Sequence, residues 1–254
     1  MALSPAVLEQ LRGVLIQQAG GYLRNPIREA RVTCAVCATP SPGFLYCHRC
    51  LMHQREPHQL ADQVGCLTYA AAGQQAGYVM RGYKATPPVK EHGVIVALTA
   101  ILGLGLHSAC AGQRLGVQVS HWAAIPSLPP KPGAHPLRAL VVPGAPGQEI
   151  TLTAMPAPDD PRAVGAGHFV AEPLPPSSHL LLIDDTWASG GHAQSAAIAG
   201  RAAGAAWVSV LAVARWIDPS WKIPEYETNG GFLRAHCTAD YEPAICPWTG
   251  GVCP

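Results

Sequence analysis

The segment that most constrains the fold is an aliphatic run that ends in two carboxylates and a glycine turn. Leu180–Ile183 is wholly aliphatic, as expected of a strand covered on both faces. Asp184–Asp185 and then Gly190–Gly191 follow it, before residues 193–206, whose alanines favour a helix. Residues 207–213 are rich in valine and predict a second strand. Strand, turn, helix and strand make a βαβ unit, which implies a parallel sheet and a right-handed crossover.

Other periodic segments extend this α/β pattern. Apolar residues recur at helical spacing between residues 5 and 19, and Gly20–Gly21 should end that helix. Trp122–Ile125 predicts a short strand that stops before a proline. From Cys66 onward the chain has the alternation of strands and helices expected of one α/β domain.

A nearly uncharged segment, Val94–Gly112, approaches the roughly 20 residues that a membrane span needs. Three glycines, together with His107 and Ser108, weaken that interpretation. A helix buried on all sides has the same composition, so we expect a soluble protein that does not enter a membrane. The N-terminus lacks a basic run followed by an apolar stretch and a small-residue cleavage site, so we predict no signal peptide and a cytoplasmic location.

The turn after the aliphatic run has the composition of an anion site. Gly190 and Gly191 let the backbone approach a ligand closely, and the start of the following helix directs amides at an anion. Carboxylates at a strand end can accept hydrogen bonds from sugar hydroxyls. We therefore predict binding of a phosphorylated sugar, with a plain strand–helix turn capped by an aspartate as the alternative. The candidate ligand-binding residues are Asp184, Asp185, Thr186, Ala188, Ser189, Gly190, Gly191 and His192.

Four of the nine cysteines form two Cys-x-x-Cys pairs separated by nine residues. These are Cys34, Cys37, Cys47 and Cys50. Two such pairs around a turn suit a tetrahedral four-thiolate zinc site, which is closed and therefore structural. A redox pair and buried free thiols are the competing interpretations. An odd cysteine count with this spacing favours a metal site in a reducing compartment over a disulfide framework.

The remaining cysteines carry weaker signals. A second zinc group could form near the C-terminus from His236, Cys237, Cys246 and Cys253, although their spacing is irregular and free cysteines are an equal alternative. Cys66 and Cys110 lie in apolar surroundings and are expected in the core. The other histidines, including His107, His121 and His168, show no ligand spacing.

Residues 180–192 resemble the 5-phosphoribosyl-1-pyrophosphate (PRPP) signature of type I phosphoribosyltransferases. The resemblance implies that Asp184 and Asp185 hold the ribose hydroxyls and that Ala188–His192 bind the 5-phosphate. Trp187 departs from the family pattern, which has a smaller aliphatic residue there, and His192 replaces a threonine or serine.

The order of a four-cysteine knuckle followed by a PRPP loop resembles the ComF-type phosphoribosyltransferase family, which is associated with bacterial DNA uptake. Arg81–Lys84 resembles the family's short basic stretch before a long apolar helix, which implies that Lys84 faces the pyrophosphate. The family's Arg-Gly-Phe-Asn stretch is missing, and residues 126–149 are rich in proline and glycine instead. A protein or single-stranded DNA partner is the further implication of this resemblance.

These observations combine into one set of expectations. We predict a type I phosphoribosyltransferase fold with a mostly parallel sheet and an N-terminal zinc knuckle. Residues 1–60 would hold the first helix and the knuckle, residues 61–220 the phosphoribosyltransferase-like domain, and residues 221–254 a Cys- and Trp-rich extension. The expected function is transfer of a phosphoribosyl group from PRPP, with magnesium, to an unidentified acceptor, and Asp184, Asp185 and Lys84 would be catalytic. The alternative is a non-catalytic module that binds PRPP or a nucleotide and docks a partner through the knuckle. The oligomeric state is left open.

Overall fold

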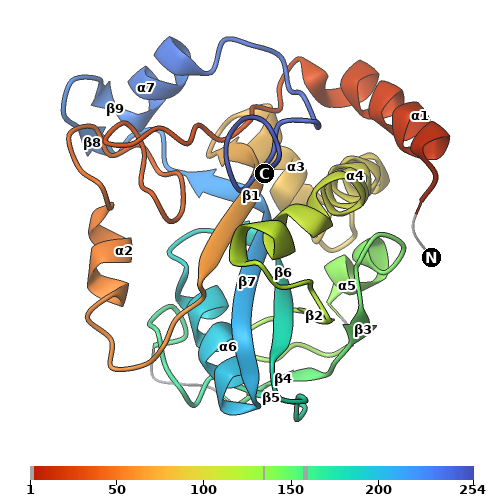
Figure 1. Ribbon diagram of the computed structural model, residues 1–254. Helices are drawn as coiled ribbons and strands as arrows, with labels where there is room; N and C mark the ends of the chain where they lie inside the picture. Colours follow the sequence, from red (N-terminus) through yellow and green to blue (C-terminus); the bar gives the residue numbers. More distant parts are fainter. Residues whose placement is uncertain (1–2, 134, 157–159) are drawn as a thin grey trace.

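A five-stranded sheet in which every neighbouring pair of strands is parallel forms the centre of the computed structural model, which describes residues 3–133, 135–156 and 160–254 (Figure 1). The strand order is β1-β7-β6-β2-β3. The strands are β1 (Gln63–Ala71), β2 (His121–Ala124), β3 (Gln148–Glu149), β6 (Ser178–Trp187) and β7 (Ala205–Ile217). The predicted α/β class with a mostly parallel sheet is therefore confirmed.

Side chains of the central strands alternate between two apolar cores, one on each face of the sheet. Leu181 and Ile183 of β6 belong to the core beneath α4 (Lys90–Leu115). Leu180 and Leu182 belong to the opposite core, which α6 (Gly191–Ala202) covers. Since both faces are covered, both sets of β6 side chains are apolar, which explains the continuous aliphatic run in the sequence.

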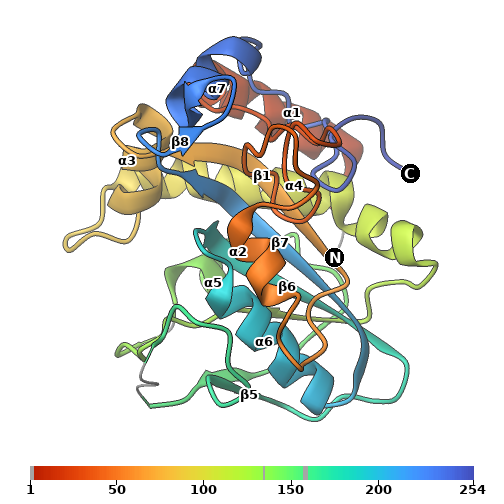
Figure 2. The same cartoon turned by 90° about the vertical axis from the view of Figure 1, so that its left-hand side faces the viewer.

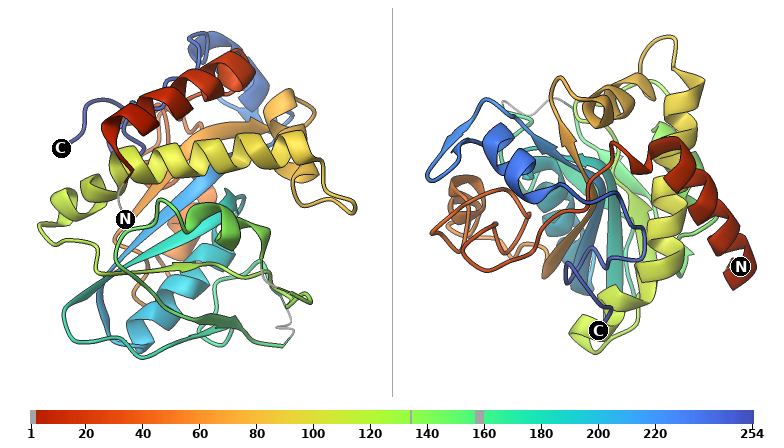
Figure 3. Two further views of the ribbon diagram at one scale, coloured as in Figure 1. Left: turned by 90° about the vertical axis from the view of Figure 1, so that its right-hand side faces the viewer. Right: turned by 90° about the horizontal axis from the view of Figure 1, so that it is seen from above.

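Helices cover the two faces unequally. On one face α4 crosses the sheet and α1 packs on α4, with α3 and α5 nearby (Figure 3). On the other face α6 lies beside α2 and the irregular segment that precedes α2 (Figure 2). The bounds are α1 (Pro5–Leu15), α2 (His48–His53), α3 (Gln75–Gly82) and α5 (Pro136–Val141).

Small elements surround the sheet. The region between β3 and β6 contains a two-stranded antiparallel sheet, and a second one follows β7 and leads into the last helix. These elements are β4 (Leu152–Ala154), β5 (Phe169–Ala171), β8 (Lys222–Ile223), β9 (Glu227–Thr228) and α7 (Asn229–His236). Phe232 of α7 packs with Tyr69 and Ile217 in a third apolar cluster at the end of β1 and β7.

The first predicted helix is continuous but changes its geometry. After α1, Ile16–Gly20 forms one π-helical turn, and the helix ends at Gly20 as the paired glycines predict. Ser4 caps the helix by accepting a hydrogen bond from the amide of Val7. Strand β1 was not predicted as an element, because its composition, with Gly65 and a buried Thr68, carries no clear alternation.

Helix α4 contains the nearly uncharged segment and is long and apolar enough to cross a membrane by length and composition. In its most apolar stretch, however, 61% of the residues are buried inside the protein. Leu102 and Leu104 have no exposed surface, because α4 lies between the sheet and α1. This is the packing of a core helix in a soluble protein.

The crossovers place a crevice at the carboxyl end of β6. From β6 the chain passes to β7 through α6 on one face, and from the neighbouring strand β2 it passes to β3 through α5 on the other face. Where neighbouring strands connect on opposite faces, the loops diverge and leave room for a ligand at the carboxyl ends of the strands. Asp184 and Asp185 lie at this edge of the sheet.

Helix α3 approaches the end of β1 closely at Gly77, and a substitution there tests this packing. A Cβ atom on Gly77 in α3 would clash with the carbonyl oxygen of Ala71, which cannot move without disturbing β1. We expect Gly77→Ala to lower the free energy of unfolding by more than about 2 kcal/mol in urea denaturation. Gly93→Ala is the matched control, because a Cβ on that helical glycine meets nothing within 4 Å. It should raise stability by up to about 1 kcal/mol. Equal effects of the two substitutions would contradict this packing.

Candidate functional site

The candidate site is built around the carboxylate pair at the end of β6. Asp185 is 5% exposed. Its Oδ2 atom accepts hydrogen bonds from the Tyr83 hydroxyl at 2.5 Å and from Lys84 Nζ at 2.6 Å. His135 Nε2 lies 3.5 Å from the same oxygen. The neighbouring Asp184 is half-buried. Tyr83 and Lys84, which directly follow α3, thus contact one of the two carboxylates of β6.

The two carboxylates have opposite electrostatic environments. Burial, reinforced by the charge of Asp185, raises the pKa of Asp184 to about 7. Burial would also raise the pKa of Asp185, but the charge and hydrogen bond of Lys84, with the hydrogen bond of Tyr83, outweigh burial and lower it. Adjacent acids that share one cation usually titrate apart in this way, so near neutral pH Asp185 is ionised while Asp184 is protonated in only part of the molecules.

The glycine turn between β6 and α6 has the tight geometry that its sequence predicts. Gly190 precedes the helix with φ +88°, and a Cβ there would clash with the indole ring of Trp187. Trp187 is only 1% exposed, so this unusual aromatic residue fills the space beneath the turn. Among the described residues, no backbone acceptor faces the amides of Ala188–Gly190. The amide of Gly191, at the start of α6, points at Ser189 Oγ at 3.5 Å, so the amides of Ala188–Gly190 are the donors left without a backbone acceptor.

A segment that sequence reasoning did not identify lies over this turn. A Cβ on Gly191 would clash with the carbonyl oxygen of Arg162, and the Ser189 hydroxyl lies 3.5 Å from that same oxygen. Burial lowers the pKa of the His192 imidazole, which also hydrogen-bonds the backbone of Pro161. The expected phosphate donors are therefore brought together, and the carbonyl of Arg162 lies against Gly191 and the Ser189 hydroxyl beside them. No periodic signal in residues 160–165 could have located this contact.

A buried arginine connects the turn to the first cysteine group. Arg215 Nη1 donates to the carbonyl oxygens of Trp187 at 2.8 Å and Ala188 at 2.9 Å. Its Nε donates to Thr39 Oγ1 at 2.8 Å. Thr39 Oγ1 in turn lies 3.2 Å from Cys37 Sγ. The cysteine group and the glycine turn between β6 and α6 are therefore connected by one chain of hydrogen bonds, although they are far apart in the sequence.

The first cysteine group has the geometry of a metal site. The four sulfur atoms of the two Cys-x-x-Cys pairs all lie within 4.8 Å of one another. Cys37 Sγ and Cys47 Sγ are 3.8 Å apart, which matches the separation of about 3.8 Å between thiolates that share a tetrahedral zinc ion. Hydrogen bonds with neighbouring thiols, that of Cys34 first, lower the pKa of the buried Cys37 thiol. This group is suitable for a metal ion.

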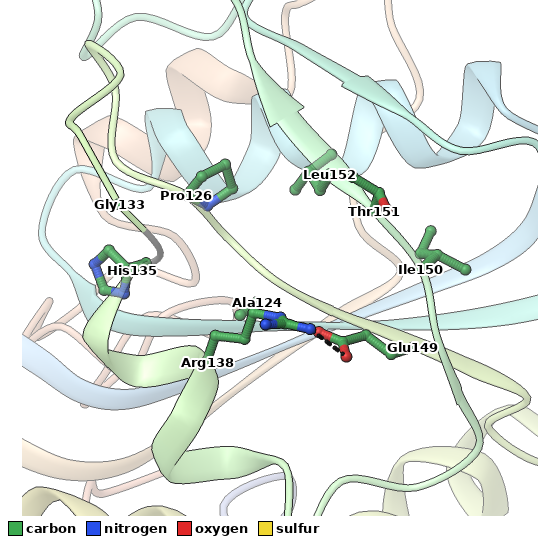
Figure 4. Close-up of a pocket in the computed structure, with 9 residues that line it drawn as sticks. All are labelled: Ala124, Pro126, Gly133, His135, Arg138, Glu149, Ile150, Thr151 and Leu152. Atoms are coloured by element: carbon green, nitrogen blue, oxygen red, sulfur yellow. Dashed lines mark hydrogen bonds and ion pairs between the residues drawn. The ribbon is translucent and has the colours of Figure 1, made fainter.

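A cavity of about 340 Å³ lies between the end of β2, the start of α5 and residues 149–152 (Figure 4). Its wall includes Ala124 at the carboxyl end of β2 and His135 at the start of α5, and His135 also faces Asp185. Arg138 Nε pairs with Glu149 Oε1 at 2.5 Å on one side of the cavity. Burial lowers the pKa of His135, which favours its neutral form. Residues 126–149 contain no recognisable motif, so the cavity was not predicted.

The structure divides the group that the sequence suggested near the C-terminus. Cys246 and Cys253 do come together, but their neighbours are His107 and Cys110 of α4. His236 instead lies 2.7 Å from the Tyr226 hydroxyl and stacks on Phe232. The structure therefore does not bring His236 and Cys237 together with Cys246 and Cys253 among the described residues. His107 and Cys110 were overlooked because their partners lie in a distant part of the chain.

Comparison with known proteins adds nothing to this geometry, since no protein-family model matches the chain and no curated protein matches it significantly.

The raised pKa of Asp184 leads to a measurable pH dependence. In the folded protein this carboxyl titrates at about 7, whereas an unfolded aspartate titrates at about 3.9. Between these values the folded state holds a proton that the unfolded state has released, so this residue's contribution to stability falls as pH rises. Asp184→Asn removes that dependence. We expect the Tm of the variant minus that of the wild type to increase between about pH 5 and about pH 8 in calorimetry without magnesium.

Asp240→Asn is the control, because Asp240 is an exposed aspartate away from the site. Its Tm difference from the wild type should stay constant over the same pH range. A constant difference for Asp184→Asn as well would contradict the raised pKa.

Proposed function

We propose that this chain is a phosphoribosyltransferase-like protein that binds PRPP, or a nucleoside 5-phosphate, at Asp184–His192. The observation that carries the proposal is the arrangement at the carboxyl end of β6. Two carboxylates, a glycine turn with free amides and a helix N-terminus follow one another directly, in the crevice of a parallel sheet. The carboxylates suit the ribose hydroxyls, and the amides at the helix N-terminus suit the 5-phosphate.

In this proposal each residue has a stated role. The amides of Ala188–His192 bind the 5-phosphate, and Asp184 and Asp185 accept hydrogen bonds from the ribose hydroxyls. Lys84 is the partly exposed member of its ion pair with Asp185. In this proposal its side chain turns away from Asp185 and contacts the pyrophosphate. Magnesium, when bound with PRPP, neutralises pyrophosphate charge, and carboxylate oxygens at this edge are ligands that it prefers.

Transfer would be a displacement at the anomeric carbon. The bond from that carbon to pyrophosphate breaks, a bond to the acceptor nucleophile forms, and pyrophosphate leaves with the bonding electrons. The protein contributes positioning and charge neutralisation. The cavity between His135 and Leu152 is the acceptor site in this proposal, since it adjoins Asp185 through His135. Neutral His135 can accept a proton from the attacking group.

A non-catalytic binding module is the second candidate, and one observation favours it. The carbonyl of Arg162 lies against Gly191 and the Ser189 hydroxyl, next to the amides that would hold phosphate, so a bound phosphate would repel this oxygen unless the residues around Arg162 moved. Trp187 and His192 also differ from the signature of catalytic phosphoribosyltransferases. Release of pyrophosphate from PRPP with a panel of amine acceptors separates the candidates, because a binding module releases none.

We infer further that the four-thiolate group holds zinc, which makes it the knuckle of a ComF-type protein. Sulfur ligands at tetrahedral separation favour zinc over harder cations. Four protein ligands leave no open position, so the ion is structural. Through Thr39 and Arg215 it also fixes the backbone of Trp187 and Ala188. Docking of a protein or single-stranded DNA through the knuckle belongs to the same proposal.

The ligand proposal predicts two separable losses of affinity. Gly190→Val should abolish binding of both PRPP and inorganic phosphate, because the new side chain meets Trp187 at a positive φ. Asp185→Asn removes a charge-assisted acceptor worth roughly 1.5–3 kcal/mol. It should weaken PRPP about 10- to 100-fold, yet leave phosphate binding intact or stronger because Lys84 loses its partner. Calorimetric titration with magnesium measures both.

Gly116→Val is the matched control for backbone strain. Gly116 also has a positive φ, at the end of α4, but a Cβ there meets nothing within 4 Å. It should leave both affinities unchanged. Failure of the wild-type protein to bind either ligand at millimolar concentration would contradict the proposal.

The zinc proposal predicts a linked effect on metal content and stability. Cys34→Ser should lower bound zinc by about one ion per chain and lower the Tm by more than about 5 °C, because structural zinc contributes directly to folding. Elemental analysis and scanning calorimetry measure these quantities. Cys237→Ser, at a half-buried cysteine outside both cysteine groups, should change neither. Unchanged zinc content in Cys34→Ser would overturn the assignment.

A further inference from the structure

A second set of potential metal ligands lies on the opposite side of the sheet from the first. One ligand atom from each of His107, Cys110, Cys246 and Cys253 falls within 4.8 Å of the others. His107 and Cys110 are one turn apart on α4, so their side chains lie on the same face of the helix. Cys246 and Cys253 belong to the C-terminal segment, which passes beside the end of α4 (Figure 3).

The histidine ring is oriented as a metal ligand would be. His107 Nε2 lies 2.8 Å from the carbonyl oxygen of Pro243, which can only accept, so this nitrogen carries the proton. In the neutral ring the lone pair is then on Nδ1. Nδ1 faces Cys253 Sγ at 3.3 Å and Cys110 Sγ at 3.9 Å. A hydrogen bond from the other ring nitrogen to a carbonyl is the usual support of a metal-binding histidine.

The distances around this ring fit a tetrahedral ion. With ordinary Zn–S and Zn–N bond lengths, ligand atoms in such a site are about 3.5–3.8 Å apart. The two Nδ1–sulfur distances lie on either side of that range. His107 is 1% exposed and Cys110 is 3% exposed, so these donors do not face bulk water.

The turn that carries Cys246 is closed by backbone hydrogen bonds. Gly250, with φ +78°, donates its amide to the carbonyl of Cys246 at 2.8 Å, and Cys246 donates its own amide to the carbonyl of Gly251 at 2.9 Å. Cys246 is fully buried, so this turn holds its sulfur inside the protein beside the two ligands of α4.

Contacts outside the four ligands hold the two segments in place. The Trp248 indole Nε1 donates to the backbone carbonyl of His107 at 3.2 Å. Arg114, one turn beyond Cys110, donates to the carbonyl of Trp248 at 3.1 Å. Trp248 is buried against Gly65 of β1. The C-terminal segment is therefore fixed on α4 by its own packing, which assembles the four ligands before a metal binds.

We propose that His107, Cys110, Cys246 and Cys253 bind one zinc ion that joins the C-terminal segment to α4. Three thiolates and one imidazole are a common structural zinc set, and four protein ligands close the site to substrate. Zinc suits this soft mixture better than magnesium or calcium does. The site is separate from the proposed ligand turn and from the first cysteine group, and it does not depend on either assignment.

The experiment counts zinc in the full-length protein purified with a thiol reductant. The wild type should carry about two zinc ions per chain, one from each group. Cys246→Ser/Cys253→Ser should carry one fewer, and Cys37→Ser should also carry one fewer. The matched control His236→Gln/Cys237→Ser changes the same residue types in the same C-terminal region, outside the group, and should keep the full zinc content.

A second variant and a second measurement distinguish loss of a zinc ligand from misfolding of the double variant. Cys253→Ser alone changes an exposed residue, so it should fold and lose zinc to a chelator at least about tenfold faster than the wild type, since one thiolate is missing. Cobalt substitution should give a tetrahedral spectrum whose difference between wild type and Cys253→Ser shows loss of one thiolate. Two outcomes overturn the proposal. One is unchanged zinc content and chelator kinetics in both C-terminal variants. The other is alkylation of fewer than the nine cysteines in denatured, unreduced protein, which would indicate a disulfide.

Discussion

The position of the buried Arg215 guanidinium determines how the two halves of the candidate site are held together. Arg215 lies on β7, opposite Trp187 on one side and Tyr69 on the other. Burial would lower its pKa, but the nearby cysteines, Cys37 first, more than offset burial and raise it. An ionised arginine inside a protein needs nearby anions and acceptors. The cysteine group supplies charge, and the backbone of the ligand turn supplies acceptors, so neither can move without leaving the cation unpaired.

This constraint links the four-cysteine group to the glycine turn. A glycine turn with free amides is prone to collapse onto itself, and here Trp187 beneath it and Arg215 beside it prevent that. The carbonyls of Trp187 and Ala188 point at the guanidinium, which leaves the amides of the same peptides directed outward. A four-thiolate zinc ion would carry net negative charge, so loading the knuckle strengthens its attraction for Arg215. Metal occupancy and readiness of the turn for an anion are thus physically linked in this proposal.

The sequence predicted the features that are encoded locally. The aliphatic run of β6, the alanines of α6, the long helix α4 and the two Cys-x-x-Cys pairs each lie within a few consecutive turns or strands, where periodicity and spacing are informative. Contacts between distant segments depend on other information. The placement of Lys84 near Asp185, 101 residues away, rested on a family resemblance, and the approach of His107 to Cys253, 146 residues away, was not predicted. No local pattern specifies such pairings, because the order of strands in the sheet and the path of the irregular segments determine them.

The long irregular segments of this chain need contacts that hold them against the sheet. Glycine and proline make up 51 of the 254 residues, 26 and 25 respectively, and both lower the regular hydrogen bonding that a segment can form. The segment before α2, which carries three of the four clustered cysteines, and the segment after α7 have little secondary structure of their own, yet each packs against the sheet or its covering helix. Fixing a long loop in one position costs conformational entropy. Only 13% of the residues are charged, so surface ion pairs offset little of that cost. Two closed metal sites, one on each face of the sheet, would join these segments to β1, α4 and β7, and leave the region between β2 and β6 free to adapt to a ligand.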